Sequence, residues 1–113
     1  MTIQEIIDLQ MLAFNNRDIK NMMSLYTDDT KIYNFADLSL VINSKKECEE
    51  MFIKLFEQSP DLNAGIIKTI FFNNKAIVYE YVSGRNGSNE KKEQVVIFEI
   101  EGQKISRMDI IRE

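Results

Sequence analysis

The single proline of this sequence, Pro60, divides the chain into two parts with different hydrophobic periodicity. Before it, apolar residues recur every three or four positions, which is the period of an amphipathic helix. After it, β-branched and aromatic residues form runs separated by polar turns, as expected for antiparallel strands. Because a proline disfavours helical geometry in the residue before it, the last helix should end near Ser59. The pattern therefore predicts an α+β domain whose helices come first.

Helix-capping residues indicate three helices in the first part. Thr2 and Glu5 have the spacing of a capping box and precede an apolar stripe of helical period. Asp18 can cap a second, shorter helix. Ser44 and Glu47 repeat the capping-box spacing before a third helix with a complete apolar stripe. That stripe consists of Cys48, Met51, Phe52, Leu55 and Phe56.

Two short strands and four long ones are predicted. The short strands, over residues 31–35 and 38–42, lie between the second and third helices. The long strands cover residues 66–72, 76–82, 94–100 and 104–111. The sheet has to curl around the helices to bury them. Since 113 residues are the usual size of one domain, we expect a single domain over 1–113.

The amino-acid composition excludes several classes of function. The sequence has no histidine, which removes His-dependent base catalysis, Ser-His and Cys-His nucleophiles and His-ligated metals. Its net charge of -4 repels nucleic-acid backbones. No apolar run reaches the roughly 18 residues of a membrane span, and the acidic N-terminal segment is unlike a signal peptide. We expect a cytoplasmic protein with no metal, no cofactor and no nucleic-acid or membrane partner.

Three short motifs follow one another along the chain: Ala13–Asp18 (AFNNRD), Leu25–Asp29 (LYTDD) and Glu101–Ile105 (EGQKI). Together with the order of the elements, they resemble the nuclear transport factor 2-like superfamily, also called SnoaL-like. The resemblance implies a curved antiparallel sheet wrapped around three N-terminal helices, the cystatin-like α+β cone. The superfamily includes ketosteroid isomerase, scytalone dehydratase, limonene epoxide hydrolase, polyketide cyclases and non-catalytic binding domains, so the fold leaves the function open.

Comparison with ketosteroid isomerase leaves the catalytic residues unassigned. The resemblance places Asn34 at the position of the isomerase's carboxylate base, and an amide cannot take a proton from carbon. It places Gln10 at the position of the oxyanion tyrosine and Val96 at that of the protonated aspartate. All three positions depart from the pattern, so steroid isomerisation by that mechanism is not expected.

The predicted cavity is apolar with one polar pair. Gln10 interrupts the apolar stripe of the first helix, and a buried amide without partners costs about 1–3 kcal/mol. The hydrogen-bond partner of the Gln10 amide could be Asn34, a backbone group, a trapped water or a ligand. We take Gln10 and Asn34 as the preferred pair. The resemblance implies that the long strands turn six residues inward, toward the aromatic residues of the helices. The predicted pocket residues are therefore Gln10, Phe14, Asn34, Phe52, Phe56, Ile77, Tyr79, Tyr81, Val96, Phe98 and Met108. Such a wall suits a flat or lipophilic small molecule, and plain core packing is the alternative.

The other face of the sheet also carries apolar residues, which predicts a second partner for it. Glu80 alternates with Tyr79 and Tyr81 and is therefore assigned to this outer face. A homodimer through this face is expected, as is common in the superfamily. The candidate interface ion pairs involve Glu80, Glu99, Arg107 and Asp109. Arg112, on the inner side, is a candidate to meet an anionic group at the cavity mouth.

Three functions are compatible with these observations. The preferred hypothesis is a dimeric cone-shaped domain that binds a small apolar molecule, with no assigned chemistry. An enzyme of the same fold, of isomerase, cyclase or hydrolase type, would require a titratable side chain with a shifted pKa inside the cavity. A dimeric protein-interaction module would instead have a packed interior.

Overall fold

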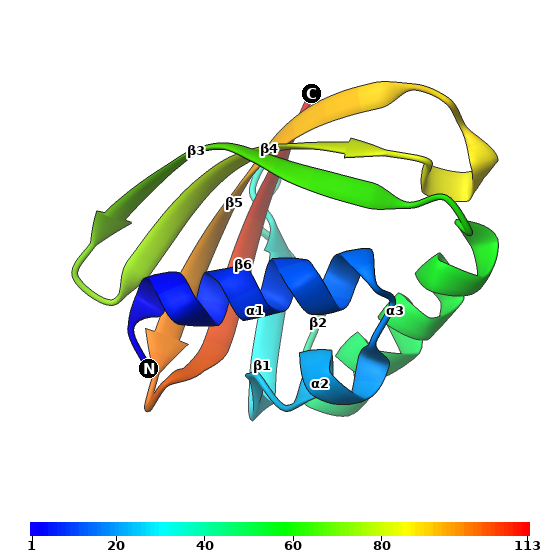
Figure 1. Cartoon of the computed structure of the whole chain (residues 1–113). Coiled ribbons are helices and arrows are strands. Elements are labelled where there is room, and N and C mark those ends of the chain that lie inside the picture. The colour runs from blue at the N-terminus through cyan, green and yellow to red at the C-terminus, as the bar shows by residue number, and fades with distance from the viewer.

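The computed structural model describes residues 1–113, and in it a curved six-stranded sheet arches over three helices (Figure 1). The helices are α1 (Ile3–Asn15), α2 (Ile19–Met23) and α3 (Lys45–Gln58), with a short 3-10 turn, η1 (Arg85–Gly87). The strands are β1 (Tyr26–Asn34), β2 (Ser39–Ile42), β3 (Asn63–Phe72), β4 (Lys75–Ser83), β5 (Lys91–Glu101) and β6 (Lys104–Arg112). The predicted α+β cone is confirmed.

Side-chain caps begin all three α-helices as predicted. Thr2 Oγ1 accepts a hydrogen bond from the Glu5 backbone N–H at 3.1 Å, and Glu5 Oε1 accepts one from the Thr2 N–H at 3.0 Å. Asp18 caps α2 through the Asn21 N–H, at 3.2 Å. Ser44 Oγ accepts a hydrogen bond from the Glu47 backbone N–H at 3.2 Å, which caps α3. These bonds satisfy N–H groups that a helix start leaves without partners.

The strand order is β2-β1-β6-β5-β4-β3, and one neighbouring pair is parallel. Strands β3 to β6 form the predicted antiparallel series, but β1 runs parallel to β6. Strand β1 also begins earlier than expected, because Tyr26 already pairs with Ile105. The segment 27–29, which precedes the predicted strand and contains the turn formers Thr27, Asp28 and Asp29, therefore lies within the strand. Sheet pairing has overridden its turn-forming residues.

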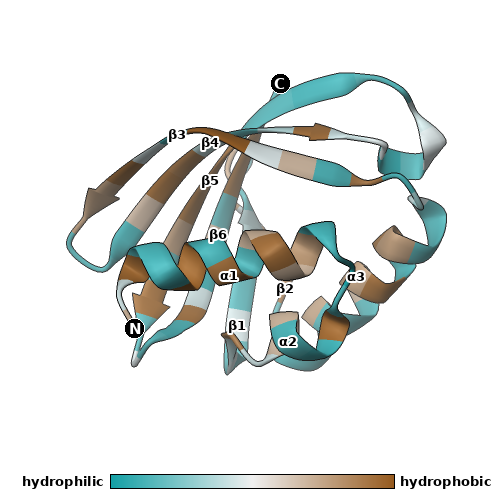
Figure 2. Ribbon diagram, in the orientation of Figure 1, coloured by the Kyte–Doolittle hydropathy of each residue, from teal (hydrophilic) through white to brown (hydrophobic).

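Aromatic packing joins α1 to α3 beneath the sheet. The Phe14 ring lies 5.6 Å from that of Phe56 and 6.3 Å from that of Phe52, in both cases edge to face. Tyr26 of β1 extends the cluster, with its ring 6.4 Å from Phe52. Figure 2 shows hydrophobic residues along α1 and along the strands that arch over it. None of the helices combines the length and the apolar composition of a membrane span.

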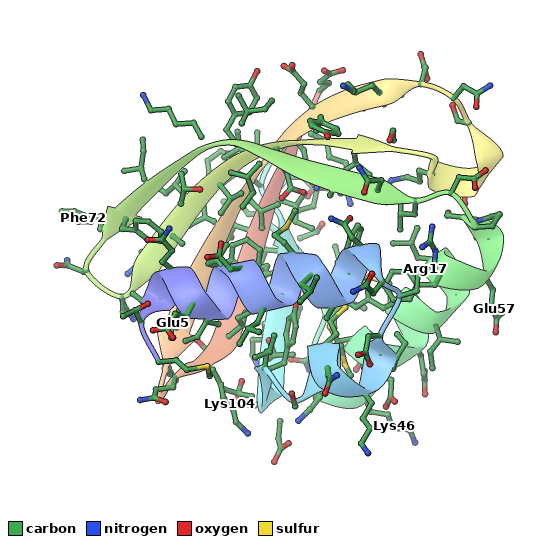
Figure 3. The ribbon with its side chains drawn as sticks, in the orientation of Figure 1. Glu5, Arg17, Lys46, Glu57, Phe72 and Lys104 are labelled. Carbon is green, nitrogen blue, oxygen red and sulfur yellow. The ribbon has the colours of Figure 1, made fainter.

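The C-terminal end of α1 is tied to the segment that leads into β3. Asn15 exchanges two hydrogen bonds with the backbone of Ala64, at 2.8 and 2.9 Å. Arg17 donates to the carbonyl oxygens of Pro60 and Leu62. Figure 3 shows Arg17 where the chain leaves α1, on the side of α3. These contacts fix α1 against the sheet and so define one wall of the interior.

Candidate functional site

A cavity of about 130 Å³ lies between α1, α3 and the inner face of the sheet. Most of its wall is apolar, and its polar members are Gln10, Glu80, Arg85, Gln94 and Arg112. For comparison, an apolar cavity of about 150 Å³ accommodates benzene. The space therefore suits a molecule with a body about the size of one ring.

Six of the predicted pocket residues line this cavity. They are Gln10, Phe14, Phe52, Val96, Phe98 and Met108. Gln10 and Phe14 lie on α1, and Phe52 lies on α3. Val96 and Phe98 lie on β5, and Met108 lies on β6. Helical periodicity was sufficient to orient the helix residues of this set. Both faces of β5 are apolar, so the inward orientation of Val96 and Phe98 was predicted from the family resemblance.

The predicted orientation of β4 is wrong. Glu80 faces the cavity, whereas Ile77, Tyr79 and Tyr81 lie on the outer face. The register explains this, because Glu80 pairs with the cavity residue Gln94 and directly paired residues share a face. Both faces of β4 carry apolar side chains, so alternation alone could not say which face points inward.

The outward tyrosines are held by contacts on the outer face. Tyr79 OH donates a hydrogen bond to Glu93 Oε1 at 2.5 Å. The Tyr81 ring covers Gly65, where a Cβ atom would have no room, and the Lys91 ammonium lies 4.1 Å from the ring centroid. Neither tyrosine can therefore contribute its hydroxyl to the cavity in this arrangement.

Phe56 and Asn34 do not line the cavity, in contrast to the prediction. Phe56 is buried against Phe14 and belongs to the packed core. Asn34 lies at the end of β1, where its Oδ1 accepts a hydrogen bond from the Ala36 N–H at 3.4 Å. The predicted pair of Gln10 and Asn34 is not formed, because Asn34 caps the turn into β2 instead.

Gln10 bonds with Tyr26. Its Nε2 donates to Tyr26 OH at 3.4 Å, and that hydroxyl donates to Met108 Sδ at 3.7 Å. Burial raises the pKa of Tyr26 well above its usual value, so the phenol stays protonated. The Gln10 Oε1 atom is buried without a hydrogen-bond partner. Gln10 itself is one of the residues that line the cavity.

Glu80 is the carboxyl group of the cavity. Its side chain is 5% exposed, and Gln94 Nε2 donates to Glu80 Oε2 at 2.8 Å. Burial raises its pKa to about 6, against the opposing effects of Gln94 and Arg85. A carboxyl group with such a pKa can exchange a proton near neutral pH. The apolar neighbours of Glu80 on its own face, such as Val78 and Val82, were the sequence signal that it is buried.

The other predicted interface charges lie on the outer face but are paired within the chain. Arg107 donates two hydrogen bonds to the Asp109 carboxylate, at 2.8 and 3.0 Å. Glu99 forms an ion pair with Lys75 at 3.3 Å. None of these three predicted charges needs a second subunit to be neutralised.

The remaining reactive groups do not form a metal or nucleophile site. No group of three or more His, Cys, Asp or Glu side chains is placed to hold a metal ion. Cys48 is buried in the core, and burial raises its pKa to about 12. A thiol of that acidity is not a nucleophile at neutral pH.

The comparisons with known proteins agree with this architecture. The cystatin-like cone defines a class of proteins with diverse functions, and residues 7–108 match the SnoaL-like domain family. The chain belongs to that family. No curated protein matches it in sequence.

Several solved structures share the fold. An uncharacterized cystatin-fold protein from Novosphingobium aromaticivorans is 24% identical, with 99% of each chain covered and a TM-score of 0.90. A hypothetical protein with a ketosteroid isomerase-like fold from Catenulispora acidiphila, in complex with trimethylamine, is 11% identical over 99% of this chain and 88% of that one, with a TM-score of 0.84. A putative polyketide cyclase from Sinorhizobium meliloti is 16% identical over 94% and 93%, with a TM-score of 0.81.

Proposed function

We propose that this protein binds a small, largely apolar molecule in the cavity between α1, α3 and the sheet. The observation that carries the proposal is Gln10, which lines the cavity and whose buried Oε1 has no hydrogen-bond partner within the chain. Burying such an acceptor costs about 1–3 kcal/mol, which a bound hydroxyl or amine would recover. The Catenulispora acidiphila protein, solved with trimethylamine, supports the use of this fold for small ligands.

The test uses benzyl alcohol, one apolar ring with one hydroxyl, titrated into labelled protein and followed by amide NMR. We expect shifts at Gln10, Ala64 and Val96, which surround the cavity. Val96→Phe fills the space and should abolish them. The matched control is Val95→Phe on the opposite face of β5, which should leave binding intact. Shifts confined to the outer face, or binding that survives Val96→Phe, would contradict the proposal.

A second candidate function, favoured by the position of Glu80, is proton transfer on the bound molecule. The Glu80 carboxylate would accept a proton from a carbon next to a carbonyl, and the resulting carboxylic acid would return it. In D₂O, the proton on the Glu80 carboxyl group exchanges with solvent deuterium before the transfer back to carbon, which places deuterium on the methyl group of acetophenone. We expect the protein to accelerate the exchange and Glu80→Gln to lose the acceleration. Equal rates with and without the protein would reject this candidate.

We also propose that two copies associate through the outer face of the sheet. The support is an apolar patch on that face, formed by the half-buried side chains of Ile77, Val95, Ile97 and Ile111. A protein-interaction module with a packed interior is not favoured, because the interior contains the cavity.

A further inference from the structure

Two of the four arginines lie where the apolar cavity meets a polar depression. Arg85 begins η1 directly after β4, and Arg112 is the last residue of β6. Both line the cavity, and both also line the adjoining depression of about 410 Å³. Gln94 is the third residue common to the two hollows. A molecule extending from one hollow into the other would pass these side chains.

The guanidinium groups of Arg85 and Arg112 have no partners within the chain. Neither forms an ion pair or a side-chain hydrogen bond, unlike the other two arginines. Arg17 is bonded to backbone carbonyls, and Arg107 is bonded to Asp109. Ten guanidinium N–H donors at the cavity are thus unused by the protein, since each arginine has about five.

The electrostatics of this pair favour an anion. Burial and the nearby charge of Arg112 both lower the pKa of Arg85, which means that the two positive charges act on each other. Glu80 is the one acidic residue of the cavity wall, against two arginines. Glu80 already accepts a hydrogen bond from Gln94. The wall therefore carries one positive charge in excess.

The acidic residues around the depression have other contacts. Glu90 lies 3.8 Å from the Lys92 ammonium. Glu93 accepts from Tyr79 OH on the outer face, at 2.5 Å. Glu113 Oε1 accepts from the Glu93 backbone N–H at 3.1 Å. None of the three forms an ion pair with Arg85 or Arg112.

We propose that the natural ligand is a small carboxylic acid, with its carboxylate between Arg85 and Arg112 and its apolar body among Phe14, Phe52 and Phe98. This inference rests on the proposed binding function and specifies the ligand class. A planar guanidinium matches a carboxylate with two parallel hydrogen bonds. Cavity volume limits the body to about one ring.

The experiment compares probes that differ in charge but hardly in shape. The pairs are benzoate and benzamide, phenylacetate and phenylacetamide, and cyclohexanecarboxylate and its amide, with binding measured by calorimetry and amide NMR. We expect at least one carboxylate to bind about tenfold or more tightly than its amide, the effect of a charge-assisted hydrogen bond. Arg85→Gln and Arg112→Gln should each reduce this preference, and the double variant should remove it. Lys46→Gln removes one positive charge from the exposed side of α3 and should leave the preference for the carboxylate unchanged.

The outcomes separate this inference from the binding function itself. Equal binding of acid and amide, or a preference that survives the double variant, overturns the carboxylate assignment and leaves small-molecule binding standing. Tighter binding of phenyl phosphate than of every carboxylate would also overturn it in favour of a phosphate ligand. If no probe binds, benzyl alcohol included, both proposals fail. Amide spectra of each variant establish that it is folded.

Discussion

At the scale of single residues, Glu80 changes the chemical character of the cavity most. A carboxyl group that is 5% exposed, among apolar side chains, has its ionised form disfavoured by burial. Gln94 compensates in part through its hydrogen bond of 2.8 Å. Glu80 is the one acidic group among the five polar residues of a mainly apolar wall. Its raised pKa is the basis of the proposed proton transfer.

Glu80 should also make stability depend on pH. Its pKa is about 6 in the folded protein and 4.5 when exposed, so the folded state holds the proton more tightly. The free energy of unfolding should therefore fall as pH rises from about 4.5 to about 6, by about 2 kcal/mol. Glu80→Gln should lack this fall and be more stable by about that amount at pH 7.

Urea denaturation of the wild type and Glu80→Gln at pH 4, 5, 6 and 7 measures this effect. Glu5 and Asp37 have lowered pKa values in the folded protein. Their ionised forms therefore stabilise the folded state above the unfolded pKa, and this stabilisation is lost as the pH falls. Both proteins retain these two residues, so their effects cancel in the difference. Glu57→Gln, at an exposed position of α3, is the control. A Glu80→Gln variant that tracks the wild type at every pH would show that burial does not perturb this carboxyl group.

At the scale of elements, β4 shows which information the sequence lacked. Ala76, Val78 and Val82 alternate with Ile77 and the tyrosines, so both faces of the strand are apolar. The pairing of Val78 with Val96 decides the orientation, because Val96 lines the cavity. Pairing is a contact between segments distant in sequence, and local alternation carries no trace of it.

The helices were predictable because their signals are local. Thr2, Asp18 and Ser44 each cap a helix through a backbone N–H three residues ahead. Such bonds depend on neighbouring residues alone, so sequence spacing predicts them. Strand β1 is the converse case, since its first residue, Tyr26, pairs with Ile105 of β6, near the other end of the chain.

At the scale of the whole molecule, the outer face of the sheet determines the proposed association. Ile97 lies within the apolar patch, paired with Ile77 and Asp109. Ile97→Lys places a charge there and should convert a dimer into a folded monomer, because a buried unpaired charge opposes association. Leu12→Lys, at an exposed position of α1, should remain dimeric.

Sedimentation velocity over a range of concentrations measures this association, and circular dichroism establishes that each variant is folded. A wild-type chain that sediments as a monomer throughout would refute the proposed dimer. Two Ile97→Lys chains that still associate would place the interface elsewhere. Neither result would affect the cavity, whose wall a single chain supplies.

The sequence by itself determined the order of helices and long strands, the helix caps, the α+β class and those cavity residues that lie on one-sided apolar stripes. These features follow from hydrophobic period and short-range hydrogen bonds. The tertiary structure alone decided that Glu80 faces inward, that Asn34 does not line the cavity with Gln10 and that Arg85 joins Arg112 at the cavity mouth. Strand register and sheet curvature bring these residues together or hold them apart, and both arise from contacts between distant parts of the chain.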